Sequence, residues 1–285
     1  MFFYSNKVKC SAIYFETKLK KPKGLIIMAH GLGGIKELWI DKFANFFAEK
    51  GYQCLLFDYR NHGASGGNKR QLINTKDQLA DWNNAIDFAK RKLKTDNIIL
   101  FGSSFSGGHV IKLLSERKDV TAAISQCPYT DTIATVKALP ARKILKFFFP
   151  VLLDLLSCLT GYHPYMIKTI GNDEKNSLIA VPDYSEYLER LPQNLDVPNL
   201  IPARTVFQFL KYSPGKYFKK INKPILVVSC LKDSLTPAYK TIKLAKQCKT
   251  AVVKGINCNH FDIYFNGFFD EACEYYLEFL DAQVH

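Results

Sequence analysis

Short apolar runs alternate with amphipathic windows along most of the chain. Runs with the length and aliphatic content of buried strands lie at 24–29, 53–57, 97–101, 120–125, 224–229 and 250–253. Apolar residues at spacings of three and four predict helices at 37–50, 78–93, 110–114 and 268–280. The start, 7–15, predicts one or two antiparallel edge strands. This order predicts an α/β fold with a mostly parallel sheet and helices on both of its faces.

The alternation stops between residues 128 and 223, where eight prolines after Pro128 interrupt aromatic and leucine-rich segments. We expect several short helices there, inserted over the carboxyl ends of the strands, where open α/β sheets bind ligands. The core domain is then 1–127 with 224–285, and the cap is 128–223. The apolar residues of the cap either line a pocket or pack the cap onto the core, and packing is the commoner role of apolar helix faces. These residues are Phe147, Phe148, Phe149, Leu152, Leu153, Leu155, Leu156, Tyr162 and Tyr165.

Composition indicates a folded globular protein, because 47% of the 285 residues are hydrophobic and 23% are charged. The net charge of +13 fits nucleic acid, an anionic membrane or an acidic substrate. Its lysines and arginines form short scattered groups without a nucleic-acid-binding motif, which favours a solvated basic surface. The apolar stretch 144–159 is shorter than the roughly 20 residues that span a membrane. It also holds Lys146, Pro150 and Asp154, so it predicts an embedded or interfacial helix.

The eight cysteines lack C-x-x-C spacing, which favours reduced and mostly buried thiols. The first ten residues hold too short an apolar run for a signal peptide, and we expect a cytoplasmic protein. Cys258 and His260 lack further ligands at the spacing of a zinc site. We therefore expect no metal and no cofactor.

A candidate nucleophile follows the run at 97–101. Ser104 occupies the apex of Gly102-Ser103-Ser104-Phe105-Ser106, directly before a predicted helix. A tight turn from strand to helix needs small residues beside its apex, since the two elements approach closely there. Ser106 replaces the last glycine of G-x-S-x-G, and Ser103 and Ser106 are the alternative hydroxyls. The alternative to a nucleophile turn is an ordinary glycine- and serine-rich helix start or a phosphate-binding turn.

A serine nucleophile needs a base and a group that orients the base. His260 follows the last strand, in a loop that can reach back across the sheet edge. Asp233 follows the run at 224–229 and lies between serine and base in chain order; its competitors are Asp131 and Asp262. The remaining histidines favour other roles: structural hydrogen bonds for His30 and His62, packing for His109, the insertion for His163 and the terminus for His285.

Charge that develops on the substrate oxygen needs backbone N–H donors. The loop His30-Gly31-Leu32-Gly33-Gly34 follows the first buried strand and can turn the N–H of Leu32 toward the site. Phe105, next after the nucleophile at a helix start, offers the second N–H. We therefore predict an oxyanion hole formed by Leu32 and Phe105.

With these parts in order, the sequence resembles the α/β-hydrolase superfamily from residue 7 to residue 280. The strings that carry the resemblance are 30–34, D-Y-R-N-H-G-A-S-G-G at 58–67, the turn around Ser104, Asp233 with Pro237, and N-H-F-D-I-Y at 259–264. They look most like the branch of serine aminopeptidase-like, X-prolyl dipeptidyl-peptidase-like and acetyl-esterase-like hydrolases. The resemblance implies an eight-stranded sheet, a helical cap after the sixth strand and a Ser-His-Asp enzyme. It does not imply one substrate.

We therefore expect a serine hydrolase of the carboxylesterase or thioesterase type, which acts through an acyl-serine intermediate. An acyltransferase or a peptidase on the same triad is one alternative, and a non-catalytic ligand-binding protein with this fold is another. The expected partner is a small acyl substrate, hydrophobic or attached to an anionic carrier such as coenzyme A, and not nucleic acid. The basic charge also fits peripheral contact with an anionic membrane.

Overall fold

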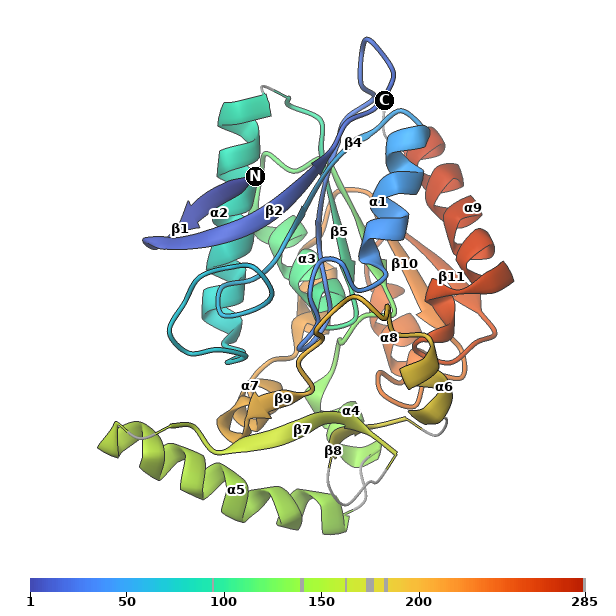
Figure 1. The fold of residues 1–285 in the computed structure, drawn as a ribbon. Coiled ribbons are helices and arrows are strands. Elements are labelled where there is room, and N and C mark those ends of the chain that lie inside the picture. Colours follow the sequence, from blue (N-terminus) through green and yellow to red (C-terminus); the bar gives the residue numbers. More distant parts are fainter. Residues whose placement is uncertain (94, 139–140, 162, 173–176, 182–183, 284–285) are drawn as a thin grey trace.

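The computed structural model describes residues 1–93, 95–138, 141–161, 163–172, 177–181 and 184–283 (Figure 1). Its main sheet has eight strands in the order β1-β2-β4-β3-β5-β6-β10-β11. The strands are β1 (Phe2–Ser5), β2 (Val8–Phe15), β3 (Leu25–Ala29), β4 (Gln53–Phe57), β5 (Ile98–Ser103), β6 (Ala122–Gln126), β10 (Ile225–Cys230) and β11 (Ala251–Ile256). The six strands from β4 to β11 in this order are parallel, and β1 and β2 join the edge antiparallel. The predicted eight-stranded, mostly parallel sheet is confirmed.

Helices cover both faces of the sheet because its central strands are apolar on both sides. Helices α1 (Ile40–Glu49) and α9 (Asn266–Gln283) pack on one face, and α2 (Thr75–Leu93), α3 (Phe105–Glu116) and α8 (Ala238–Ala245) pack on the other (Figure 1). In β5, Phe101 faces the first layer and Leu100 the second. This alternation leaves the carboxyl ends of the strands as the polar edge where a site can form.

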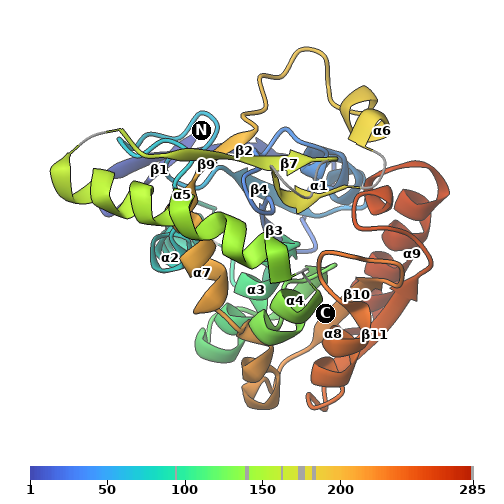
Figure 2. The ribbon, with the colours of Figure 1, turned by 90° about the horizontal axis from the view of Figure 1, so that it is seen from below.

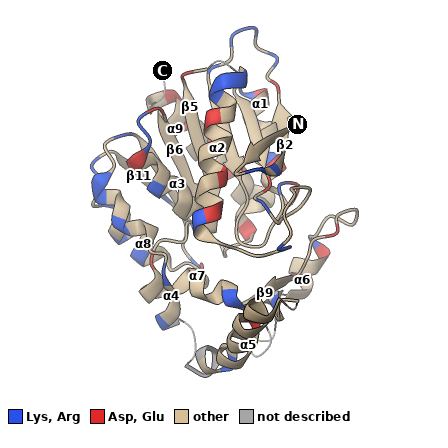
Figure 3. Cartoon of the chain, turned by 90° about the vertical axis from the view of Figure 1, so that its left-hand side faces the viewer, with Lys and Arg blue, Asp and Glu red and all other residues tan. Residues whose placement is uncertain are grey.

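The predicted core elements are present, with ends that differ by a few residues. The edge prediction is also confirmed, since β1 pairs antiparallel with β2 and β2 with β4. Helix α8 was not predicted, because its eight residues are fewer than the window over which helical periodicity is recognised. Lys and Arg lie on α2, α4 and α8 rather than in one patch (Figure 3).

The insertion lies between β6 and β10 (Figure 2). Its elements are α4 (Thr132–Ala138), α5 (Ala141–Thr160), β7 (Met166–Gly171), β8 (Ser177–Ala180), α6 (Tyr184–Glu189), β9 (Leu200–Pro202), α7 (Val206–Leu210) and the 3₁₀ helices η1 (Ala203–Thr205) and η2 (Pro214–Lys220). Strands β8, β7 and β9 form a small separate sheet. The structure thus differs from the expectation of helices alone. These strands have three to six residues, too few for a clear alternating pattern.

The end of the insertion returns to the core. Phe218, in η2, and Ile221 are buried in the apolar layer that α2 and α3 form with the sheet. The segment that covers the sheet edge therefore ends before η2.

The structure describes all eight cysteines, of which seven are buried and Cys158 is exposed. None of them forms a disulfide. Among the helices of the described residues, none is both long and apolar enough to cross a bilayer.

Candidate active site

Ser104 lies at a sharp turn between β5 and α3. Its φ of 56° and ψ of −115° are strained for a residue with a side chain. A Cβ on Gly102 would lie 2.2 Å from the carbonyl oxygen of Ser106, so only glycine fits two residues before the apex. The backbone N–H of Ser104 donates to the carbonyl of Gln126 in β6 (2.9 Å), which fixes the turn to the neighbouring strand.

Ser106, which replaces the last glycine of the motif, is buried and fully bonded. Its hydroxyl donates to the carbonyl of His30 and accepts from the hydroxyl of Tyr59, which in turn accepts from the indole N–H of Trp82 (2.7 Å). The extra hydroxyl therefore links the serine turn to the glycine-rich loop after β3.

The structure brings Ser104, His260 and Asp233 together. His260 Nε2 lies 3.0 Å from Ser104 Oγ, and His260 Nδ1 lies 2.5 Å from Asp233 Oδ2. A carboxylate accepts, so Nδ1 carries the proton and donates to Asp233. Nε2 is then free to accept the proton of the serine hydroxyl. This arrangement has the geometry of a Ser-His-Asp triad, in which the acid orients the imidazole that faces the serine hydroxyl.

The loop after β10 holds the carboxylate of Asp233 in place. Its Oδ1 accepts the backbone N–H groups of Leu235 (2.7 Å) and Thr236 (2.9 Å), and its Oδ2 accepts the Thr236 hydroxyl (2.7 Å). Burial raises the pKa of Asp233, but the charge and hydrogen bond of His260 and the bonds from Thr236 outweigh it and leave the pKa below its ordinary value. Asp233 is therefore ionised where it meets the imidazole.

Two opposing effects set the basicity of His260. Burial lowers its pKa, whereas the charge and the hydrogen bond of the Asp233 carboxylate raise it, and the net pKa lies above the ordinary 6.5. A buried imidazolium beside a carboxylate is thus stabilised, which suits a group that receives a proton during a reaction.

The alternative hydroxyl and acids contact other groups. Ser103 Oγ shares a hydrogen bond with the hydroxyl of Tyr264 (2.6 Å) and accepts from the amide of Gln126 (2.8 Å). Asp131 accepts the N–H of Ala134 (2.7 Å), and Asp262 pairs with Arg190 (3.0 Å).

Three of the other histidines, His30, His62 and His109, have structural partners. His30 and His62 donate from Nδ1 to the backbone carbonyls of Gly31 and Arg60, both at 2.9 Å. Burial lowers the pKa of His109 to about 3, and its ring bonds Tyr212 and Gln78. His163 lies in the loop before β7, and His285 lies outside the described residues.

The two predicted oxyanion donors lie beside Ser104. Phe105 is the first residue of α3, and within the described chain neither its N–H nor that of Leu32 donates to a protein acceptor. The preceding Gly31 approaches so closely that a Cβ on it would lie 3.0 Å from Ser104 Cβ and 3.5 Å from Oγ. The loop therefore passes directly over Ser104.

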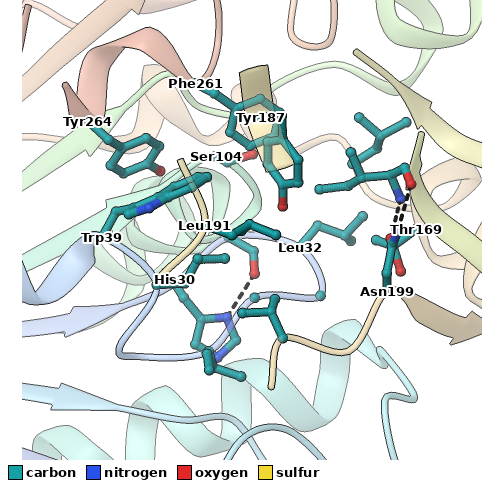
Figure 4. Close-up of a pocket in the computed structure, with 18 of the residues that line it drawn as sticks. His30, Leu32, Trp39, Ser104, Thr169, Tyr187, Leu191, Asn199, Phe261 and Tyr264 are labelled. Carbon is teal, nitrogen blue, oxygen red and sulfur yellow. Dashed lines mark hydrogen bonds between the residues drawn. The ribbon is translucent and has the colours of Figure 1, made fainter. Parts of the chain in front are cut away.

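Ser104 and His260 open into a cavity of about 220 Å³ between core and cap. Trp39, Tyr187 and Phe261 form an aromatic wall with ring centroids 5.1 to 6.0 Å apart (Figure 4). Thr169 of β7 and Asn199 lie together at another side of the cavity, where Asn199 bonds both backbone groups of Ile170 (2.8 Å each) (Figure 4). The cap therefore supplies much of the lining.

Thr169 was not found by sequence reasoning. It is buried, it lines the cavity, and its hydroxyl has no partner among the described residues. An unpaired buried hydroxyl is costly unless something fills its hydrogen bond. Thr236 and Tyr59 were missed as well, since nothing local in the sequence indicates which distant group they bond. Within the part of the chain that the structure describes, no three His, Cys, Asp or Glu side chains gather as a metal site requires.

A model of the family described as serine aminopeptidase, S33, matches residues 20–259. The chain belongs to this family of α/β-hydrolases. It is 35% identical to the quorum-quenching protein AidA of Acinetobacter baumannii over 285 residues, which cover 99% of this chain and 94% of that protein. It is 27% identical to the polyketide transferase grgF of a Penicillium species, covering 91% and 88% of the two chains. The crystal structure of the α/β hydrolase GrgF from Penicillium sp. sh18 matches with a TM-score of 0.85 at 22% identity, over 100% of this chain and 98% of that one, which shows the common fold.

Proposed function

We propose that the protein is a serine hydrolase that cleaves carboxylic esters or thioesters through an acyl-Ser104 intermediate. The observation that carries this proposal is the hydrogen-bond chain from Asp233 through His260 to the hydroxyl of Ser104. The strained turn supports it too, because such strain at an apex presents the hydroxyl at the cavity.

The proposed reaction has two halves. Ser104 Oγ attacks the acyl carbonyl while its proton moves to His260 Nε2, and the N–H groups of Leu32 and Phe105 bind the oxyanion. Collapse breaks the bond to the leaving alcohol or thiol, which takes the proton from His260. Water then attacks the acyl-enzyme, gives a proton to His260, and the acid leaves as Ser104 regains its proton.

The cavity favours a small acyl group that is largely apolar. Its aromatic wall suits an alkyl or aryl portion, and its volume of about 220 Å³ lies below the usual range of ligand pockets. Thr169 is one of the polar residues that line it, and its buried hydroxyl has no partner among the described residues, so we expect a substrate oxygen or nitrogen to complete that hydrogen bond. By analogy with the name of AidA, a small signalling molecule with an ester bond is the proposed physiological substrate.

The test is a substrate panel run on wild type and Ser104→Ala. It sets aryl esters of increasing chain length beside lactones, coenzyme A thioesters and aminoacyl arylamides. We expect hydrolysis of esters or thioesters, stoichiometric labelling of wild type by a fluorophosphonate, and loss of both in Ser104→Ala. Wild-type turnover by Ser104→Ala, or a wild-type serine that resists labelling, would refute the proposal and favour a ligand-binding role.

Acyl transfer is the second candidate, because grgF, alike over most of both chains, is named a polyketide transferase. The same acyl-enzyme would then react with an alcohol or amine in place of water. Product partition between water and added alcohols separates the two: ester product at acceptor concentrations far below that of water indicates a transferase, and acid alone indicates a hydrolase.

A further inference from the structure

Helix α5 turns its apolar face away from the protein. Leu145, Phe148, Phe149 and Leu159 are 74, 62, 70 and 84% exposed. Four further leucines on this helix are at least 38% exposed: Leu152, Leu153, Leu155 and Leu156. At 100° per residue these side chains cover one broad outward face. The helix forms the lower edge of the molecule in Figure 1 and crosses the viewer's side of β7 in Figure 2.

The inward face of α5 is narrow, and its contacts attach the helix to the rest of the protein without the exposed phenylalanines and leucines. Phe147 and Val151 are buried in the apolar cluster that joins the cap to Ile73 and Phe105 of the core. Asp154 is buried one turn further on and accepts the backbone N–H groups of Arg204 (2.7 Å) and Tyr165 (3.0 Å). The Arg204 side chain pairs with it at 3.2 Å. The helix thus buries its carboxylate and exposes its phenylalanines and leucines, the reverse of an ordinary surface helix.

The predicted packing role holds for Phe147, which is buried in one apolar cluster with Ile73 and Phe105 of the core, but neither predicted role holds for the exposed side chains. None of the exposed ones lines the cavity that contains Ser104, and their exposure shows that they do not pack the cap onto the core. Of the other residues in that prediction, Tyr165 is 45% exposed and Tyr162 lies outside the described residues. An exposed apolar surface of this extent marks an interaction site.

The charge around α5 selects the kind of partner. Residues 132–171 contain five Lys or Arg and one acidic residue, a formal charge of +4: Lys137, Arg142, Lys143, Lys146, Lys168 and Asp154. Since Asp154 is buried and paired, the exposed charge near the helix is basic, as at Lys137 and Lys168. In Figure 3 the helix itself is mostly tan. A second copy would bring two such regions, and two chains of +13, face to face.

We propose that α5 binds the surface of an anionic lipid membrane. The helix lies in the plane of the interface, its outward phenylalanines and leucines enter the boundary between headgroups and acyl chains, and the exposed Lys137 and Lys168 face the lipid phosphates. Strand β7, which packs behind α5, carries Thr169 in the cavity wall. A docked membrane would therefore lie one layer from the candidate active site.

The test is flotation with lipid vesicles, using the full chain. Wild type should float with phosphatidylcholine vesicles that contain phosphatidylglycerol, float much less with phosphatidylcholine alone, and detach in high salt. Phe148→Ser/Phe149→Ser should reduce the partition coefficient at least about tenfold, since each ring contributes apolar area to the contact. The matched control, Leu19→Ser/Tyr239→Ser, removes two exposed apolar side chains elsewhere (49 and 71% exposed) and should change it less than about twofold.

Two results would overturn the proposal. The first is wild type that does not float with anionic vesicles at low salt, or that floats equally with the Phe148/Phe149 variant. The second is wild type that sediments as a dimer while the Phe148/Phe149 variant sediments as a monomer, because a second copy would then cover the helix. Ser104→Ala should float like wild type, so the outcome is independent of the proposed esterase activity.

Discussion

Replacing Asp233 by Asn would invert the tautomer of His260. Because Oδ1 of Asp233 accepts two backbone N–H groups, the amide oxygen of Asn must take that place. The amide NH₂ then faces His260 Nδ1, where Oδ2 now lies at 2.5 Å. It donates to Nδ1, so the imidazole carries its proton on Nε2, facing Ser104, and can no longer accept the serine proton.

The size of the effect follows from this exchange of donor and acceptor. The side chain keeps its shape and its backbone bonds, so folding should be intact. Loss of the correct tautomer in a Ser-His-Asp site lowers kcat about 10⁴-fold, which corresponds to about 5 kcal/mol of transition-state stabilisation.

The assay is steady-state hydrolysis of the best ester from the panel, with the rate of fluorophosphonate labelling as a second measure. Both should fall together in Asp233→Asn, whereas KM should change little. Asp131→Asn is the matched control, since Asp131 follows another strand and bonds Ala134 rather than His260. If Asp233→Asn keeps kcat within about tenfold of wild type, the orienting role of Asp233 is wrong.

Three further results are expected. Only the neutral ring of His260 can act as a base, and its pKa lies above 6.5. The value of kcat/KM should therefore fall as the pH drops through a midpoint above 6.5. A midpoint below 6.5 in the pH profile would contradict the raised pKa. Thr169→Val should raise KM about fivefold for esters whose acyl group carries a hydrogen-bonding atom, and it should leave KM for simple alkyl esters unchanged. An equal change of KM for both kinds of ester would contradict a hydrogen bond from Thr169 to the substrate. Lys36→Met should lower the free energy of unfolding by about 3 to 5 kcal/mol in urea denaturation, because it leaves the buried carboxylate of Asp58, now 2.7 Å from Lys36 Nζ, without its cation. A loss below about 1 kcal/mol would mean that the pair contributes as little as an exposed one.

The sheet could be predicted because its central strands are buried on both faces, so their apolar runs appear undiluted in the sequence. The positions of Ser104, Asp233 and His260 followed from the same regularity, since each comes after a strand whose carboxyl end meets one edge of the sheet. Their catalytic roles and the two oxyanion donors stay predictions until the substitutions are measured.

Other features depend on contacts that no local pattern contains. The hydroxyl of Thr236 and the bond from Tyr59 to Ser106 join residues whose pairing only the folded chain defines. In α5, periodicity indicates an apolar face but not whether that face points inward. The buried Asp154 decides it, because its backbone partners come from Tyr165 and Arg204.

The bond between Ser106 and the carbonyl of His30 has a consequence for how such proteins diverge. It ties the turn around Ser104 to the glycine-rich loop after β3, so a shift of either segment would also move the other. Glycine at 106 would leave both the Tyr59 hydroxyl and the His30 carbonyl without their hydrogen-bond partner. We therefore expect homologues with glycine at 106 either to carry a different residue at 59 as well, or to hold an ordered water where the serine hydroxyl lies.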